Sequence, residues 1–276
     1  MKKLPLYLTS LLLLFIYSCK KSNSSSNSSN SNSWLSSVTN YSAQESIVDS
    51  FSYDSSHRLA SFMQFGYDTS GSNIQYGNWS AIFSLPAGSS AAPTSYTNNL
   101  TGTTELHQLT YDAQGRIIKD SSTGSSGWVI YFGYPNGNIA INAYYDGTVA
   151  NSLLDTLFMS NGNIGSFHVY GPNNAGTADS LEGVIKYGFS GIANPAYHST
   201  LTNSIGPLIY ILEISGYGGT FDAISQKVLN SMSGQTDGLP AGVTISYSLT
   251  TDSKGRLSQQ SASYGGGYAN IVYRYY

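Results

Sequence analysis

The stretch LTYDAQGRII, residues 109–118, decides the fold. It sets Asp112, Gly115 and Arg116 between two apolar runs, at the spacing of a tight turn between two β-strands. An Asp at the first position of a type I turn accepts hydrogen bonds from the turn's own backbone. A Gly three residues later supplies the positive φ that closes the hairpin with a bulge. The Asp and Arg then form an opposite-charge pair across the hairpin neck, so the stretch predicts a structural turn rather than a catalytic loop.

The same unit occurs twice more, near the two ends of the chain. In the first copy His57 takes the place of the glycine, and His is one of the few side chains enriched at positive φ. The turn residues of the three units are Asp54, Arg58, Asp112, Gly115, Arg116, Asp252, Gly255 and Arg256. Asn-Gly pairs at 136–137 and 161–162 predict two further hairpins. Turns of this kind join antiparallel strands that are neighbours in the chain.

Alternating apolar and polar residues between these turns predict the strands themselves. Residues 243–250 alternate Val, Ile, Tyr and Leu with Ser and Thr, which is typical of a strand with one buried face. The composition agrees, with 29 Gly, 23 Tyr and only 10% charged residues. We therefore expect an all-β fold, an antiparallel meander of ten or more strands that forms a strongly curved sheet or a closed barrel. At most one or two short helices are expected, one of them around Gly206-Pro207, where the alternation breaks.

The N-terminus predicts export from the cytoplasm. Lys2 and Lys3 precede an apolar run over residues 4–17 that is shorter than the about 20 residues of a membrane-spanning helix, so residues 1–18 are expected to be a signal peptide. Residues 16–19, Ile-Tyr-Ser-Cys, resemble the lipobox of bacterial lipoproteins, which implies that Cys19 is lipidated. The Ser/Asn tract over residues 19–33 has too few apolar groups to fold and is expected to be a disordered tether. Residues 34–276 form one expected domain.

The turn units resemble the YD repeats of RHS-type proteins. Together with the lipobox, Asn194-Pro195 and the aromatic strand over residues 268–276, they resemble a group of outer-membrane lipoproteins of Bacteroidota whose domain is described as porin-like in fold. The resemblance implies an outer-membrane lipoprotein, on the periplasmic or the cell-surface face, with a sheet that curls or closes. It implies no activity, since none is established for that group.

No catalytic constellation is evident, and an enzyme is not expected. His57, His107, His168 and His198 lie far apart in the sequence, without carboxylates or cysteines at metal-ligand spacing, and no cofactor motif is present. A glycoside-active enzyme stays open as an alternative, because carboxylate pairs such as Asp179 with Glu182 suit that chemistry. The net charge of −3, without basic clusters, argues against nucleic acid as a partner.

A binding or structural module of the cell envelope is the leading functional hypothesis. The partners expected are the membrane, through the lipid on Cys19, and a glycan or an envelope protein. Tyrosine offers a rigid stacking face with a polar tip, which suits sugars. The candidate ligand-binding residues are Tyr144, Tyr145, Tyr217, Tyr264 and Tyr268. An integral membrane barrel is a further class, opposed by the Ser and Thr expected on outward faces where lipid would require apolar side chains.

Overall fold

The structure is a computed structural model that describes residues 34–42, 45–68, 75–87, 91–100, 103–124, 127–144, 152–172, 179–195, 197, 205–209, 224–235, 244–264 and 267–276. The expected signal peptide, Cys19 and the expected tether lie outside the described residues. The same holds for Tyr145 and Tyr217, two of the candidate ligand-binding residues.

Seventeen strands form one antiparallel sheet, as the alternation and the turns predict. The first nine are β1 (Leu35–Tyr41), β2 (Glu45–Tyr53), β3 (Leu59–Asp68), β4 (Gln75–Ser84), β5 (Ser95–Leu100), β6 (Thr103–Tyr111), β7 (Ile117–Ser122), β8 (Val129–Gly133) and β9 (Ile139–Tyr144). The others are β10 (Ser152–Ser160), β11 (Asn163–Pro172), β12 (Asp179–Ala193), β13 (Lys227–Gln235), β14 (Thr244–Ser246), β15 (Ser248–Thr251), β16 (Leu257–Tyr264) and β17 (Gly267–Tyr275).

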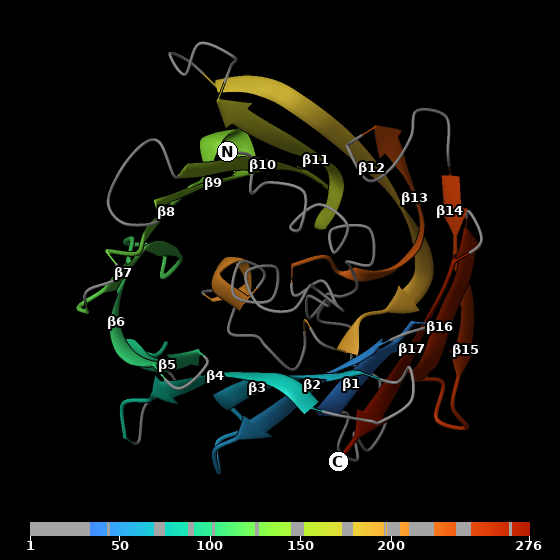
Figure 1. Ribbon diagram of the computed structural model, residues 1–276, viewed down its shortest axis with the longest axis horizontal. Helices are drawn as coiled ribbons and strands as arrows, with labels where there is room; N and C mark the ends of the chain where they lie inside the picture. The colour runs from blue at the N-terminus through green and yellow to red at the C-terminus, as the bar shows by residue number, and fades with distance from the viewer. Residues whose placement is uncertain are drawn as a thin grey trace, which may run out of the picture.

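The sheet curls into a nearly closed barrel (Figure 1). Strands pair with their neighbours in the chain, and β1 pairs antiparallel with both β2 and β17, which joins the two ends of the meander. β14 pairs with β13, and β15 pairs with β16. These two short strands are separated only by Tyr247, whose N–H donates to the carbonyl of Asn230 at 2.8 Å. The expected all-β meander is confirmed.

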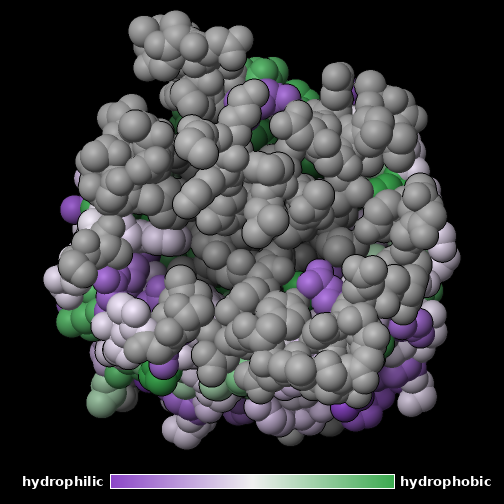
Figure 2. All heavy atoms as spheres, viewed as in Figure 1, coloured by the Kyte–Doolittle hydropathy of each residue, from purple (hydrophilic) through white to green (hydrophobic). Residues whose placement is uncertain are grey.

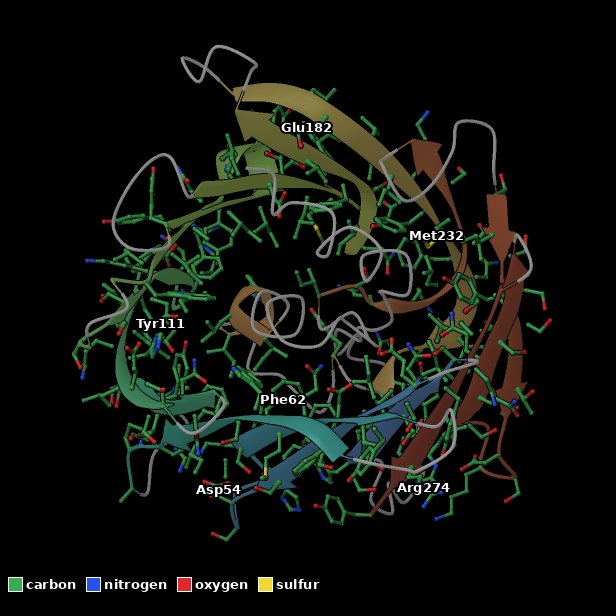
Figure 3. The ribbon with its side chains drawn as sticks, viewed as in Figure 1. Asp54, Phe62, Tyr111, Glu182, Met232 and Arg274 are labelled. Atoms are coloured by element: carbon green, nitrogen blue, oxygen red, sulfur yellow. The ribbon has the colours of Figure 1, made fainter. Side chains whose placement is uncertain are left out.

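The inward faces of the strands form the core of the barrel. Phe62 lies inside the ring of strands and is fully buried, whereas Arg274 lies on the outside and is exposed (Figure 3). Described side chains around the outer margin of the barrel are mainly hydrophilic, with scattered hydrophobic ones (Figure 2). The largest fully buried side chains are Tyr96, Phe62, Phe167, Leu35, Ile117, Ile130 and Ile141. The apolar side chains of the alternating sequence thus point into the barrel.

The described parts of the connection from β12 to β13 contribute to the core of the barrel. Asn194 Nδ2 donates to the carbonyl of Ser225 at 2.9 Å, and Ser225 Oγ accepts from the N–H of Ile164 at 3.0 Å, which holds the connection beside the β10–β11 turn. Its buried apolar residues include Ile205, Leu208, Ile209 and Ile224. Part of it forms a short helix over residues 206–209, inside the ring in Figure 1, where Gly206-Pro207 predicts one.

Pro135–Gly137 forms a 3-10 turn between β8 and β9. In the described part of the chain, every helix is too short to cross a bilayer.

Candidate functional site

The three Asp/Arg units lie at hairpin turns with nearly identical geometry. In the second unit Asp112 Oδ1 accepts the backbone N–H groups of Gln114 and Arg116, both at 2.9 Å, and Asp112 Oδ2 accepts from Arg116 Nε at 2.7 Å. The first and third units repeat these contacts. Gly115 and Gly255 have φ of +75°, and His57 has φ of +60° in the equivalent position. One carboxylate therefore closes each turn through both its oxygens.

These hydrogen bonds keep the three carboxylates ionised. Desolvation at the hairpin neck would raise the pKa of Asp54, Asp112 and Asp252. The hydrogen bonds from the arginine and from the turn backbone outweigh it and lower the pKa of each below its ordinary value. Each carboxylate is committed to its own turn and to its arginine, so the units act as structural closures.

The arginine of each unit also contacts the next strand or loop. Arg116 lies over the ring of Tyr134 and Arg256 over the ring of Tyr275, with 4.1 Å from the guanidinium carbon to the ring centroid in both cases. In the first unit Arg58 Nη1 donates to the carbonyl of Pro86 at 2.9 Å. The units thus connect three strands rather than two.

The candidate tyrosines do not form one cluster. Tyr144 is half-buried in β9, opposite Val129 of β8 and Ser152 of β10. Tyr264 and Tyr268 occupy ladder positions at the ends of β16 and β17, several strands away from β9 in the sheet order. Of the five candidates, only Tyr144 has a described side-chain environment.

Tyr144 lies beside a row of outward-facing side chains that crosses six strands, from β7 to β12. Successive members occupy directly opposite positions in the strand ladders. We call this set the outer row; its members are Lys119, Tyr131, Asn142, Leu154, Tyr170 and Leu181. Tyr131 and Leu181 are 46% and 51% exposed, and the other four are half-buried. Side chains directly opposite in an antiparallel ladder share a face, so the row is one continuous strip.

Local contacts order the outer row around Tyr131. The Tyr131 and Tyr144 rings meet edge to face, with centroids 6.0 Å apart, and Lys119 Nζ lies 5.6 Å from the Tyr131 ring centroid. Asn142 Nδ2 donates to the Tyr144 hydroxyl at 2.8 Å. His168 lies between Phe158 and Tyr170, with ring centroids 4.3 and 6.5 Å away. The outer row, together with the neighbouring Tyr144 and His168, therefore combines aromatic faces with amide, ammonium and imidazole groups.

A buried polar cluster lies on the inner face of β5, β6 and β7. The Tyr96 hydroxyl donates to Asp120 Oδ2 at 2.7 Å, and His107 Nδ1 lies 3.0 Å from both Asp120 Oδ1 and the Tyr96 hydroxyl. The Tyr96 and His107 rings are stacked at 4.5 Å. Burial, and then the charge of Asp120, raise the pKa of Tyr96 well above its ordinary value. Since a carboxylate only accepts, Nδ1 of His107 carries the hydrogen shared with Asp120.

This cluster resembles the acid–base half of a hydrolytic triad without its nucleophile. His107 Nε2 is buried and has no hydrogen-bond partner among the described residues, so no described hydroxyl or thiol is positioned to give it a proton. The described residues also contain no group of three or more His, Cys, Asp or Glu side chains that could hold a metal ion. The sequence places no carboxylate at metal-ligand spacing from a histidine, and the contact between His107 and Asp120 joins residues 13 positions apart. Strand alternation would have placed His107 on the buried face with Leu109.

Asp155 is a second ionisable side chain in the core. It lies in β10, is 1% exposed, and its Oδ1 has no hydrogen-bond partner in the described part of the chain. Burial alone raises its pKa to about 8, against an ordinary value of 3.8. Asp155 is therefore protonated at neutral pH and does not offer a charge to a ligand.

Comparisons with known proteins find similar solved structures. No protein-family model matches the chain, and no curated protein matches it. Among solved structures, a porin-like protein from Bacteroides uniformis has a TM-score of 0.44 and 13% sequence identity, over 88% of this chain and 98% of that chain. The barrel architecture of the present chain stands on its own strand register, described above.

Proposed function

We propose that the protein is an envelope lipoprotein, anchored through a lipid on Cys19, and that its barrel is a glycan-binding module. The anchor is supported by the apolar run and the lipobox-like residues that precede the chain's single cysteine. The outer membrane is its proposed location. The three turn units, which resemble YD repeats, serve as structural closures of the barrel.

The outer row is the observation that carries the binding function. Tyr131 and Tyr170 are three strand steps apart, which is roughly 14 Å at about 4.8 Å per step. Asn142 and Lys119 supply a hydrogen-bonding amide and an ammonium beside the exposed ring of Tyr131. Aromatic faces separated by polar groups suit the alternating apolar and hydroxyl faces of a sugar chain. A protein interface would favour a more continuous apolar centre.

A diffusion channel is a poorer fit to this barrel. Water-filled barrels have polar interiors and an outward apolar band. Here Phe62, Phe167 and Ile141 are fully buried, and the connection that carries Leu208 occupies part of the interior. Outward positions such as Thr110 and Thr250 are exposed and polar. The polarity is that of a barrel surrounded by water.

An enzyme is also a poorer fit. His107 and Asp120 are in contact, but no described nucleophile accompanies them. Glu182 is exposed on β12 near Leu181 of the outer row, and the side chain of Asp179, its expected partner, lies outside the described side chains. We therefore place function on the outer wall rather than in the interior.

The test is affinity electrophoresis of the purified protein in native gels that contain a soluble β-glucan, a mannan or a mucin-type glycoprotein. Tyr131→Ala and Tyr170→Ala are each expected to weaken retardation about tenfold, which corresponds to about 1.4 kcal/mol. Ile82→Ala is the matched control, since Ile82 is 57% exposed on β4, outside the outer row. Equal mobility of the protein in all gels and in a gel without polysaccharide would overturn glycan binding and leave an envelope protein as the partner to seek.

A further inference from the structure

The two ends of the barrel differ in the connections that they carry. One end, which we call the turn end, carries the connections over residues 54–58, 85–94, 112–116, 134–138, 161–162, 194–226 and 252–256. The opposite end, the loop end, carries the connections over 42–44, 69–74, 101–102, 123–128, 145–151, 173–178, 236–243 and 265–266. In a meander, successive connections alternate between ends, and the three Asp/Arg units therefore all fall at the same end.

The first and last described residues both lie at the turn end. The N–H of Tyr276 donates to the carbonyl of Trp34 at 3.0 Å, and β1 begins opposite the end of β17. The Trp34 ring stacks on His57, in the first Asp/Arg unit, with centroids 5.1 Å apart and an interplanar angle of 13°. The point at which residues 19–33 join the barrel is thus held by specific contacts at the turn end.

Aromatic side chains surround this point. The Trp34 ring lies 5.3 Å from that of Tyr53, and Tyr53 meets Tyr276 edge to face at 6.1 Å. Tyr276 is 62% exposed, and its hydroxyl donates to the carbonyl of Phe51 at 2.7 Å. We call Trp34, Tyr53, His57 and Tyr276 the exit cluster. Trp and Tyr are enriched where proteins meet the membrane–water interface, because they combine an apolar ring with a polar tip.

Chain length favours one end of the barrel as the end that faces a membrane holding Cys19. The sequence predicts a Ser/Asn tether of about 14 residues, and a tether of that length typically reaches roughly 20 Å. At about 3.4 Å per residue, the nine-residue strand β6 is roughly 30 Å long. A barrel turned with its loop end to the lipid would need the tether to run the whole length of the wall. The turn end requires no such extension.

We infer that the turn end faces the lipid surface and that the exit cluster contacts it. The inference rests on the proposed lipid anchor at Cys19. At this end Asp54 pairs with Arg58 and Asp252 pairs with Arg256, so these carboxylates do not face an anionic surface as unpaired charges. The loop end then points away from the membrane, and the outer row stands on a wall that extends from the lipid into water.

The orientation is tested with the lipidated full chain on vesicles of phosphatidylethanolamine and phosphatidylglycerol that carry a headgroup-attached energy acceptor. Ala113→Cys and Thr104→Cys place a donor dye at opposite ends of β6, at two exposed positions. Only the introduced cysteine reacts, because lipidation occupies the Cys19 thiol. Energy transfer is expected to be several-fold stronger from position 113. Equal transfer, or stronger transfer from position 104, would overturn the orientation.

The contact between the exit cluster and the lipid surface is tested separately, by quenching of tryptophan fluorescence with brominated lipids. Trp34→Phe should abolish most of the quenching, whereas Trp79→Phe should retain it, since Trp79 is 3% exposed. Unchanged quenching in Trp34→Phe would overturn the contact. Failure of the lipid anchor gives a different result. If intact-mass measurement shows that the chain carries no lipid, no variant would float with the vesicles.

Discussion

Arg116 lies over the ring of Tyr134, and the hydroxyl of that tyrosine donates to the carbonyl of Ile117, the residue after the arginine, at 2.8 Å. Arg256 and Tyr275 repeat the arrangement at the other end of the chain, with a hydroxyl-to-carbonyl distance of 2.6 Å to Leu257. Each tyrosine therefore joins a hairpin to the following strand through a cation–π contact and a hydrogen bond. The first prediction separates these two contacts.

Tyr134→Phe is expected to lower the free energy of unfolding by about 1 kcal/mol, because it removes the hydrogen bond and keeps the ring under Arg116. Tyr134→Leu should cost more, since the cation–π contact is also lost. Urea denaturation measures both. Tyr131→Phe is the control, because the Tyr131 side chain is 46% exposed and should change stability little. Equal effects of Tyr134→Phe and Tyr134→Leu would mean that the stacking contributes nothing.

Gly115→Ala is expected to destabilise the fold by roughly 1–2 kcal/mol, because Gly115 has φ of +75° and a Cβ is disfavoured there. No neighbouring atom would touch the added carbon, and so backbone conformation is the sole cause. Gly191→Ala is the matched control: its Cβ also meets open space, and its φ is not in the left-handed region. Thermal unfolding compares the two variants, and similar melting temperatures would contradict the strained-turn explanation.

Asp155→Asn is expected to stabilise the protein more at pH 9 than at pH 5. The folded-state pKa of Asp155, about 8, lies above the ordinary 3.8. Between about pH 4 and pH 8 the unfolded chain has therefore lost the proton of Asp155, whereas the folded protein keeps it. Stability falls as pH rises through this window, by a total on the order of a few kcal/mol. The neutral amide does not titrate and removes this dependence. Chemical denaturation at both pH values measures it, and a pH-independent difference would show that Asp155 is not titrating.

Residues 19–276 with Cys19→Ala, without the expected signal peptide, are expected to stay in solution without detergent. Outward positions on the described strands are mainly polar, and the exposed apolar side chains, such as Ile82 and Leu106, are few and lie among threonines. Phase separation in a mild detergent should move the variant to the aqueous phase and leave the lipidated protein in the detergent phase. A variant that remained with the detergent would assign membrane affinity to the barrel wall itself.

Local chemistry made the turns and the alternating strands predictable. Asp112, Gly115 and Arg116 encode their hairpin within five residues, and the short helix follows from Gly206-Pro207. The sequence left open whether the sheet is only strongly curved or closes into a barrel. The pairing of β1 with β17, which closes it, joins residues more than 200 positions apart in the chain. No local pattern encodes such a pairing.

The buried polar cluster and the outer row both depend on contacts between strands. Tyr96, His107 and Asp120 meet because β5, β6 and β7 are in a particular register, and no single one of them is unusual in the sequence. The outer row was missed for the same reason. Tyr144 was a candidate as part of a local Tyr-Tyr pair, whereas Tyr131 becomes its neighbour, and Tyr170 joins the same row, only across the ladders.

The continuation of β14 into β15 has a consequence for how such a barrel can change in size. In an antiparallel ring, neighbouring strands run in opposite directions all the way round, and closure therefore requires an even number of positions. Seventeen strands satisfy this because β14 and β15 run in one direction on either side of Tyr247 and occupy a single position, which leaves sixteen. Gain or loss of one strand would bring two parallel edges together. A lineage of such barrels that stays fully antiparallel therefore lengthens or shortens by whole hairpins, and the Asp/Arg turn marks the unit that would be copied.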